Sequence, residues 1–489
     1  MDINTTVSVQ SPTAKLTNWR WAICSLLFFA TTINYLDRQV LSLTWKQFIV
    51  PEFHWSDADY GFITAFFSLF YAGVSLFAGK IIDFLGTKKG YLWAIFIWSL
   101  AACLHAFCGW ATAASLGMSV EQLATVQKGS AMGLTVATVS VWFFLACRML
   151  LAAGESGNFP AAIKTVAEYF PKMDRAFATS IFNAGASVGA LAAPLCIPPL
   201  AEAYGWEMAF IIIGSLGFVW MGFWGKMYSR PDKSKYVNKA ELAYILQDDK
   251  GESVQEIQEE ETKTISFWHC FRYRQTWAFV AGKAFTDGVW WFFLFWAPAY
   301  FADQFGYEAS SSMGQALLFT LYFIVTVLSI CGGYLPKLFV EKQGMNPYAG
   351  RMKAMLMFAF VPALALFAQP LGESSAWWPA IIIGLTGAAH QAWSANLYST
   401  IGDMFPKSTV ASIVGIGTMA GGLSSFGINW GSGVLFDFAE GMGPSFQFMQ
   451  FAGKPAAYMI VFSGCAVSYL LAWAVMKILV PRYKRIELR

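Results

Sequence analysis

Long apolar segments recur along the whole chain and are separated by short polar stretches. An α-helix needs about 20 apolar residues to cross the ~30 Å hydrocarbon layer of a bilayer. Twelve candidate segments have this length, centred near residues 32, 70, 100, 150, 190, 216, 290, 325, 360, 390, 422 and 468. Residues 113–134 read as an excursion on the outer side. The pattern predicts an all-α membrane protein with twelve transmembrane helices.

Basic residues gather in alternate loops, and this distribution predicts orientation. With the N-terminus inside, roughly 27 of the 33 Lys and Arg residues fall in inner loops and ends, the bias that orients membrane proteins. We therefore expect both termini in the cytoplasm. The longest polar segment separates six spans from six. The predicted parts are a tail (1–18), an N-terminal six-helix bundle (19–228), a partly helical cytoplasmic connector (229–274), a C-terminal six-helix bundle (275–481) and a second tail (482–489).

A weak internal repeat agrees with this division. The segment EYFPKMDRAFATS (168–180) resembles DMFPKSTVASIVG (403–415) at an offset of 235 residues. The same offset places Glu155 opposite His390. Parallel halves related by an axis along the membrane normal are typical of six-plus-six transporters.

Composition and motifs narrow the class of protein. The chain is 56% hydrophobic and 13% charged, whereas soluble domains average about 25% charged residues. The net charge of +3 is scattered through short loops, so we expect no nucleic-acid partner. The eight cysteines form no CxxC pair or metal-ligand spacing. Walker, GxSxG and HExxH motifs do not occur, so we expect neither an enzyme nor an ATP-driven pump, and no cofactor.

Seven ionisable residues lie well inside predicted spans one, four, seven and ten. Each buried charge costs about 2.5–3.5 kcal/mol on the insertion scale, so these residues should face a polar cavity or one another. They are Asp37, Arg38, Arg148, Glu155, Lys283, Asp287 and His390. We therefore predict that these four spans line the cavity.

The residue types indicate an anion that carries hydroxyl groups. Arg38 can hold a carboxylate through a bidentate fork, and Tyr35, three residues earlier, shares its helix face. The aromatic run VWWFFLFW (289–296), which contains Trp290, offers apolar faces to a sugar ring, although such runs are also common in cores and membrane interfaces.

Charge balance among four of these residues predicts a coupled cation. Asp37, Arg38, Arg148 and Glu155 sum to zero when ionised, so a bound monoanion leaves one negative charge that a proton on a carboxylate would neutralise. Glu155 has no adjacent Arg and has apolar neighbours that favour its protonated form, so we predict it as the main proton carrier. Asp37, beside Arg38, becomes a second, conditional proton site. Its charge is the one with which a substrate carboxylate would compete for Arg38.

Structural roles are alternatives for the same residues. The charges around Arg38 would also serve as an ion-pair network that holds helices together. Lys283 and Asp287, four residues apart, would neutralise each other on one helix face. His390 fits a packed, hydrogen-bonded side chain as well as a ligand contact.

Five motifs together resemble a known family. They are NYLDRQVLS, CRMLLAAGESGNFPAAIKTVAEYFP, FNAGASVGALAAP, DGVWWFFLFWAPAY and GAAHQAWSANLYSTIGDMFP. From Trp19 to about Val480 the chain resembles the major facilitator superfamily, its anion:cation symporter branch, and bacterial hexuronate (glucuronate/galacturonate) transporters. The resemblance implies a proton-coupled symporter that imports a hexuronate or related aldonate by rocker-switch alternating access. It also implies a multi-pass inner (plasma) membrane protein, and we expect a monomer in the bilayer.

The resemblance implies roles for individual residues. Asp37 and Glu155 would handle protons, Arg148 would be a partner of that machinery, and Arg38 would bind the substrate carboxylate. Substrate hydroxyls would contact Tyr35, Tyr71, Trp393 and Asn396. The buried charges and aromatic residues add Lys283, Trp290 and His390 as candidate substrate contacts.

Two motifs depart from the family pattern. The gating loop GxxxDRxGRR is GKIIDFLGTKKG here, which keeps Gly79, Asp83 and Gly86 but has Phe84 in place of Arg. Ala186 occupies a position that can be Gln in sugar-acid transporters. Alternatives for function are therefore a carrier of another organic anion such as a dicarboxylate, a sodium-coupled carrier, or a transporter-like nutrient sensor that signals through residues 229–274.

Overall fold

The computed structural model describes residues 16–247, 267–405, 407–484 and 486, and nearly all of them are helical. The all-α fold is therefore confirmed. Most of the predicted N-terminal tail and the middle of the predicted connector lie outside the described residues.

Long helices make up the first half of the chain. They are α1 (Trp19–Thr44), α3 (Asp57–Leu85), α4 (Thr87–Leu104), α7 (Ala131–Glu155), α9 (Lys172–Tyr204) and α10 (Trp206–Met227). Short elements lie between them: η1 (Trp45–Ile49), α2 (Val50–Phe53), η2 (His105–Phe107), α5 (Cys108–Leu116), α6 (Val120–Thr125) and α8 (Asn158–Tyr169).

The second half likewise consists of long helices with short elements between them. Its long helices are α13 (Arg274–Phe305), α14 (Ser312–Gln343), α15 (Pro347–Phe360), α17 (Trp377–Met404), α18 (Lys407–Met442) and α19 (Lys454–Leu479). Its short elements are η5 (Phe267–Arg272), η6 (Val361–Phe367), α16 (Ala368–Gly372), η7 (Gly443–Ser445) and a hairpin of β1 (Gln447–Phe448) and β2 (Phe451–Ala452). Between the halves lie η3 (Pro231–Lys233) and α11 (Lys239–Ile245).

Local chemistry explains where the helices begin and turn. Ser56 starts α3 with a capping box, in which its side chain accepts from the Asp59 backbone and Asp59 accepts from the Ser56 backbone. Ser130 and Ser311 cap α7 and α14 in the simpler way. The turn from α3 to α4 needs Gly86, whose φ of +77° other residues rarely adopt.

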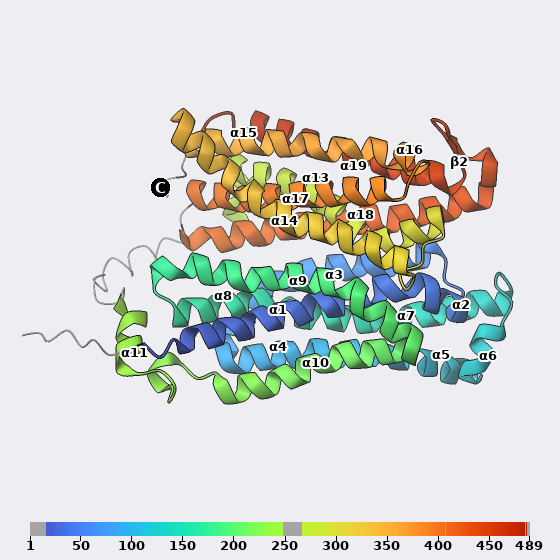
Figure 1. Ribbon diagram of the computed structural model, residues 1–489, viewed down its shortest axis with the longest axis horizontal. Helices are drawn as coiled ribbons and strands as arrows, with labels where there is room; N and C mark the ends of the chain where they lie inside the picture. The colour runs from blue at the N-terminus through green and yellow to red at the C-terminus, as the bar shows by residue number, and fades with distance from the viewer. Residues whose placement is uncertain (1–15, 248–266, 406, 485, 487–489) are drawn as a thin grey trace, which may run out of the picture.

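The helices form two bundles that lie side by side. Figure 1 shows the blue-to-green helices of the first half below and the yellow-to-red helices of the second half above. Within the first half α1 packs on α9 and α4 on α7 and α10, and in the second half α13 packs on α18 and α19. Between the halves, α3 runs along α18 and α9 contacts α14.

The two ends of the molecule carry different elements. Figure 1 shows α11 at one end, the connector end, and α2, α6 and β2 at the opposite, far end.

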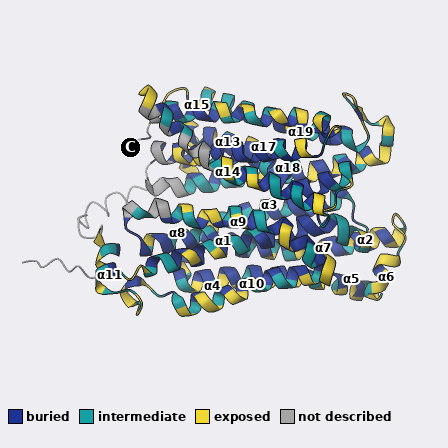
Figure 2. Ribbon diagram, viewed as in Figure 1, coloured by how far each residue is buried: buried dark blue, intermediate teal, exposed yellow. Residues whose placement is uncertain are grey.

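Apolar side chains cover the outside of the bundles as well as their core. Figure 2 shows exposed positions along the outer helix faces and buried positions between helices. The exposed ones include the large apolar residues Phe29, Trp93, Phe223, Phe367 and Leu471. Water disfavours so much exposed apolar surface, whereas lipid favours it.

Within the described ranges, eight helical segments are long and apolar enough to cross a bilayer. The chain is therefore a multi-pass membrane protein. The other long helices, α1, α13, α17 and α18, have 26 to 36 residues and also lie in the bundles. Three of these, α1, α13 and α17, contain buried charged and polar residues that lower their hydropathy.

Candidate functional site

A buried ion pair joins α1 to α7 in the first half. The Nε and Nη2 atoms of Arg38 donate to Oε2 of Glu155 at 2.9 and 2.7 Å. Arg38 is 4% exposed and Glu155 is fully buried. Glu155 has no adjacent arginine in the sequence, but in the folded chain Arg38 is its partner. Its partner lies 117 residues away on another helix, where sequence neighbours give no indication of it.

The two other charges of this group lie beside the pair. Nη1 of Arg148 donates to the backbone carbonyl of Arg38 at 3.3 Å. Asp37 interacts electrostatically with Glu155 and Arg148, but neither of its carboxylate oxygens has a hydrogen-bond partner among the described residues. The prediction that Asp37 is the carboxylate competing for Arg38 is thus wrong, because Glu155 occupies that position.

Aromatic rings from both halves surround the guanidinium of Arg38. Its central carbon lies 4.9 Å from the ring centre of Tyr71 and 5.2 Å from that of Tyr35, the neighbour that the helical spacing predicts. It also lies 5.1 Å from the ring centre of Trp291 on α13. Arg38 therefore lies where the two halves meet.

A second buried ion pair lies in the other half. Nζ of Lys283 is 2.6 Å from Oδ2 of Asp287 and donates to the hydroxyl of Tyr398 at 3.1 Å. The structural alternative for this pair, mutual neutralisation, is what the structure shows.

The remaining predicted substrate contacts gather around Tyr469. The rings of Trp290 and His390 stack at 5.5 Å, and Nδ1 of His390 hydrogen-bonds the Tyr469 hydroxyl at 2.8 Å. Trp393 meets the same tyrosine edge-on at 5.7 Å. Asn396 differs, because its amide donates to the carbonyl of Ala392 on its own helix. Trp290, His390, Trp393 and Tyr469 thus form a packed cluster in the second half. The predicted substrate contacts of Trp290, His390, Trp393 and Asn396 stay predictions.

The predicted gating loop lies at the turn between α3 and α4. Gly79 lies on α3 with no atom near the position of an added Cβ, and Gly86 makes the turn. Asp83 lies on the last turns of α3, but its side chain is outside the described part of the structure.

An ionic cluster that the sequence analysis missed links the halves at the far end. It consists of Lys46 and Asp57 from the first half and Asp303 and Lys454 from the second, and we call it the far-end cluster. Nζ of Lys46 lies 2.9 Å from Asp57 and 3.0 Å from Asp303. Lys454 pairs with Asp57 and, at 2.9 Å, with Asp303. Two cations and two anions thus alternate across the interface.

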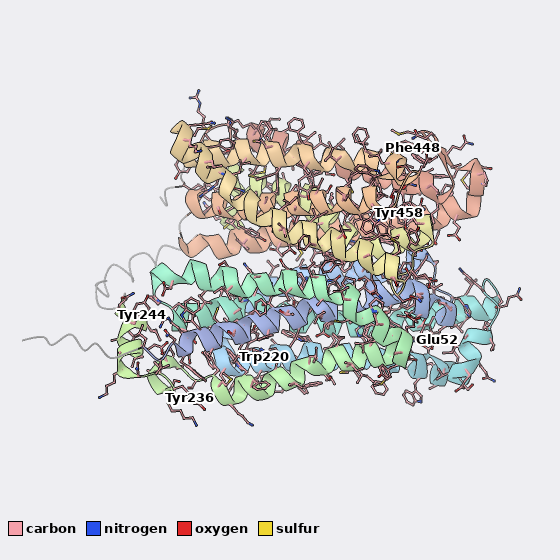
Figure 3. The ribbon with its side chains drawn as sticks, viewed as in Figure 1. Glu52, Trp220, Tyr236, Tyr244, Phe448 and Tyr458 are labelled. Carbon is pink, nitrogen blue, oxygen red and sulfur yellow. The ribbon has the colours of Figure 1, made fainter. Side chains whose placement is uncertain are left out.

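Neighbouring contacts fasten the same interface. Tyr458, which Figure 3 labels in the second half, donates to Asp303 at 2.9 Å. Asp437 on α18 accepts from the backbone nitrogens of Asp57 and Ala58 at 2.9 and 2.7 Å. A Cβ at Gly433 would lie 2.3 Å from the Asp57 carbonyl, so the close approach of α18 to α3 requires glycine there.

Beneath the cluster, aromatic side chains fill the space between the halves. Trp45 stacks on Tyr60 at 4.0 Å, and the Tyr60 hydroxyl donates to the carbonyl of Phe295 at 2.8 Å. Trp296 meets both rings edge-on. These contacts close the far end between the bundles.

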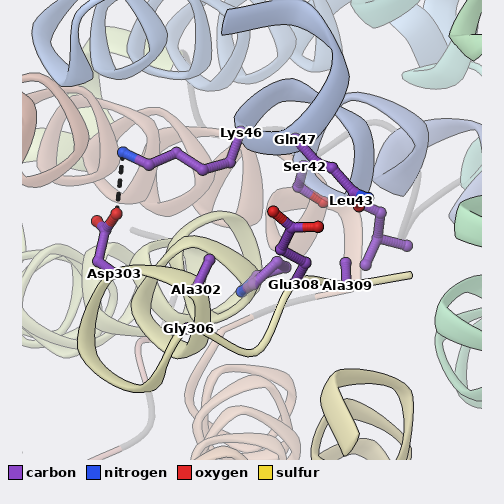
Figure 4. A pocket seen from close by; sticks show the side chains of 10 residues that line it. Ser42, Leu43, Lys46, Gln47, Ala302, Asp303, Gly306, Glu308 and Ala309 are labelled. Atoms are coloured by element: carbon purple, nitrogen blue, oxygen red, sulfur yellow. Dashed lines mark ion pairs between the residues drawn. The ribbon is translucent and has the colours of Figure 1, made fainter. Parts of the chain in front are cut away.

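A cavity of about 240 Å³ lies beside the far-end cluster and not at Arg38. Figure 4 shows the Lys46–Asp303 ion pair at this cavity, with Ser42 and Glu308 also on its wall.

Comparisons with known proteins agree with this architecture. The family model described as Major Facilitator Superfamily matches residues 27–428. A hexuronate transporter of Escherichia coli K12 is 28% identical over 415 residues, which cover 84% of this chain and 86% of the relative. A galacturonate transporter of Dickeya chrysanthemi is 28% identical, covering 73% and 94%. The crystal structure of a D-xylose-proton symporter superposes with a TM-score of 0.64 at 15% identity, covering 93% and 97%. These proteins are transporters, not enzymes.

Proposed function

The chain belongs to the major facilitator superfamily, and we propose that it is a proton-coupled symporter that imports a sugar acid, a hexuronate such as glucuronate or galacturonate or a related aldonate. Relatives named as hexuronate and galacturonate transporters support the substrate class. The observation that carries the proposal is the buried pair of Arg38 with Glu155, because it gives one cation two competing partners: the protein's own carboxylate and that of a substrate.

The competition couples the substrate to a proton. While Glu155 is ionised, both donors of the Arg38 fork that face it are occupied. A proton on Glu155 removes that charge and leaves the fork for a substrate carboxylate. Displacing an ionised Glu155 would instead leave a buried, uncompensated charge, which costs about 3–5 kcal/mol. Substrate without a proton is therefore bound weakly.

The groups around Arg38 suit a sugar acid in particular. Tyr35 and Tyr71 have hydroxyls that can donate to or accept from sugar hydroxyls. Trp291 offers a flat apolar face next to the carboxylate site. The charges of Arg148 and Asp37 act on Glu155 and so on its proton.

Transport also requires that the site open to each side in turn. We propose that α1, α13, α17 and α18 complete twelve membrane spans in two bundles of six, residues 19–228 and 275–481, joined by a cytoplasmic connector at 229–274. The bias of basic residues puts both termini in the cytoplasm of an inner-membrane protein, here taken as a monomer. The far end is then the outer side, which the far-end cluster holds closed in this conformation.

Reconstitution tests the proposal directly. Proteoliposomes with an inward proton gradient should accumulate labelled D-glucuronate or D-galacturonate, with protons as the only coupling ion and no cofactor. Glu155→Gln should abolish gradient-driven accumulation while retaining exchange of bound for free substrate. Glu202→Gln, an exposed glutamate on α9, is the matched control and should behave as the parent.

Two results would overturn the proposal. Accumulation of no sugar acid under any proton gradient would remove the substrate class. Accumulation driven by a sodium gradient alone, or undiminished in Glu155→Gln, would remove the coupling mechanism. A panel of competing organic anions, dicarboxylates included, separates a sugar-acid carrier from a carrier of other anions.

A further inference from the structure

The second half of the chain holds a cation that its own carboxylate neutralises. Lys283 is 6% exposed and Asp287 is 7% exposed, and their charged atoms lie 2.6 Å apart on one face of α13. Asp287 cannot easily turn away, because its side chain packs against α18 where a Cβ at Gly421 would lie 2.3 Å from Oδ2. The pair therefore adds no net charge to the region.

Lys283 lies close to the substrate site along α13. Trp291, which covers Arg38, comes four residues after Asp287, about one helical turn, and Lys283 comes one turn before Asp287. The ammonium of Lys283 also donates to Tyr398. An ammonium has three donors. Two bond Asp287 and Tyr398 among the described residues, and the third suits a sugar hydroxyl.

A second carboxylate on the substrate would meet a different situation. To reach Lys283 it would have to displace Asp287, and displacement leaves a buried carboxylate without its cation. Oδ1 of Asp287 has no hydrogen-bond partner in the described residues, so this carboxylate depends on Lys283 for its compensation. Such an uncompensated buried charge is strongly unfavourable.

We propose that Asp287 selects substrate by charge: its ion pair with Lys283 admits sugar acids with one carboxylate and rejects aldarates, which carry a carboxylate at each end. This inference rests on the proposed function, since it concerns the same substrate site. It makes Asp287 a specificity-determining residue that acts through Lys283.

Binding of D-glucuronate and D-glucarate to purified protein at one fixed pH tests the selection. These sugar acids share their six-carbon skeleton, but the carbon that is an aldehyde in D-glucuronate, closed as a ring hemiacetal, is a second carboxylate in D-glucarate. The parent protein should bind D-glucuronate at least tenfold more tightly than D-glucarate. Asp287→Asn keeps the shape of the side chain but frees Lys283, and it should shift the ratio of the two affinities at least tenfold toward D-glucarate.

A double variant separates charge from shape. Lys283→Gln with Asp287→Asn has neither charge, so a second carboxylate still finds no cation and the double variant should keep the preference for D-glucuronate. If Asp287→Asn does not fold, Asp287→Ser, which also frees Lys283, takes its place and should show the same shift toward D-glucarate.

Three results would overturn the inference: equal affinity of the parent for both compounds, an unchanged ratio in folded Asp287→Asn, or a gain of D-glucarate binding in the double variant. If the proposed function itself were wrong, the parent would bind no D-glucuronate, and this result differs from all three.

Discussion

Removing one carboxylate from the far-end cluster should open the closed end of the molecule. In Asp303→Asn the side chain keeps its shape and can still accept from Tyr458, but it loses its charge toward Lys46 and Lys454. A hydrogen bond to a charged group contributes about 1.5–3 kcal/mol.

The size of the effect follows from the geometry. Two such bonds weaken, the side chain of Lys46 is 29% exposed, and Asp57 continues to hold both lysines. We therefore expect a loss of about 2–4 kcal/mol from the closed conformation, after allowance for solvent screening. At 1.4 kcal/mol per factor of ten, this shifts the ratio of closed to open molecules about 30- to 700-fold.

Cysteine accessibility measures the shift. Ser42 is 2% exposed and lies on the wall of the far-end cavity. A Ser42→Cys protein should react slowly with a membrane-impermeant maleimide added outside intact cells, and much faster when Asp303→Asn is added. The protein without the Ser42 substitution supplies the background from native cysteines.

Glu440→Gln is the matched control for this experiment. Glu440 also pairs with Lys454, at 3.4 Å, but its side chain is 65% exposed, and exposed pairs contribute only about 0–1 kcal/mol. It should leave the labelling rate nearly unchanged. Labelling of Asp303→Asn no faster than the parent would refute the role of the cluster in closing this end.

Two further predictions concern single side chains. Burial raises the pKa of Glu52, labelled in Figure 3, to about 7, although Trp206 donates to it at 2.8 Å. The protonated Glu52 stabilises the fold below about pH 4.5, and this contribution is lost as the pH rises through about 7. Glu52→Gln does not titrate, so its folding stability relative to the parent should rise by about 1–3 kcal/mol between about pH 5 and 8. Unfolding temperatures measured across this range test the effect, and a pH-independent difference would contradict it. Arg38→Lys replaces a two-donor fork by a point charge and should weaken D-glucuronate binding about 10- to 100-fold. The control Arg230→Lys changes a side chain that is 72% exposed and should not weaken binding. Equal affinities of Arg38→Lys and the parent in a binding titration would exclude a role of the fork in holding the substrate carboxylate.

The sequence predicted the helices and the buried charges for the same physical reason. A bilayer tolerates few charges, so a charge inside an apolar segment stands out whatever the fold. The structure indeed buries Arg38, Glu155, Lys283 and Asp287 between helices. The family and the all-α fold followed from the same pattern.

The partners of those charges did not follow from it. Asp37 and Arg38 are neighbours in sequence, but successive residues on an α-helix point about 100° apart, so adjacency separates their side chains. Arg38 meets Glu155 only because α1 packs near α7. Similarly, Trp290 and Trp291 look alike in the sequence, yet Trp290 stacks on His390 whereas Trp291 covers Arg38.

The far-end cluster was missed for another reason. Its four members lie near helix ends, where charged residues usually face water and do not indicate a buried contact. Lys46 and Asp303 lie 257 residues apart, and only the meeting of the two halves brings them within 3.0 Å. No pattern along one helix encodes such a contact.

The central claim is that a proton on Glu155 releases Arg38 for the substrate carboxylate. Titration calorimetry of purified protein with D-glucuronate, repeated near neutral pH in buffers of different ionisation enthalpy, counts the protons taken up on binding. We expect uptake of up to one proton per substrate in the parent and in Glu202→Gln, and almost none in Glu155→Gln. Equal proton uptake by the parent and Glu155→Gln would contradict it.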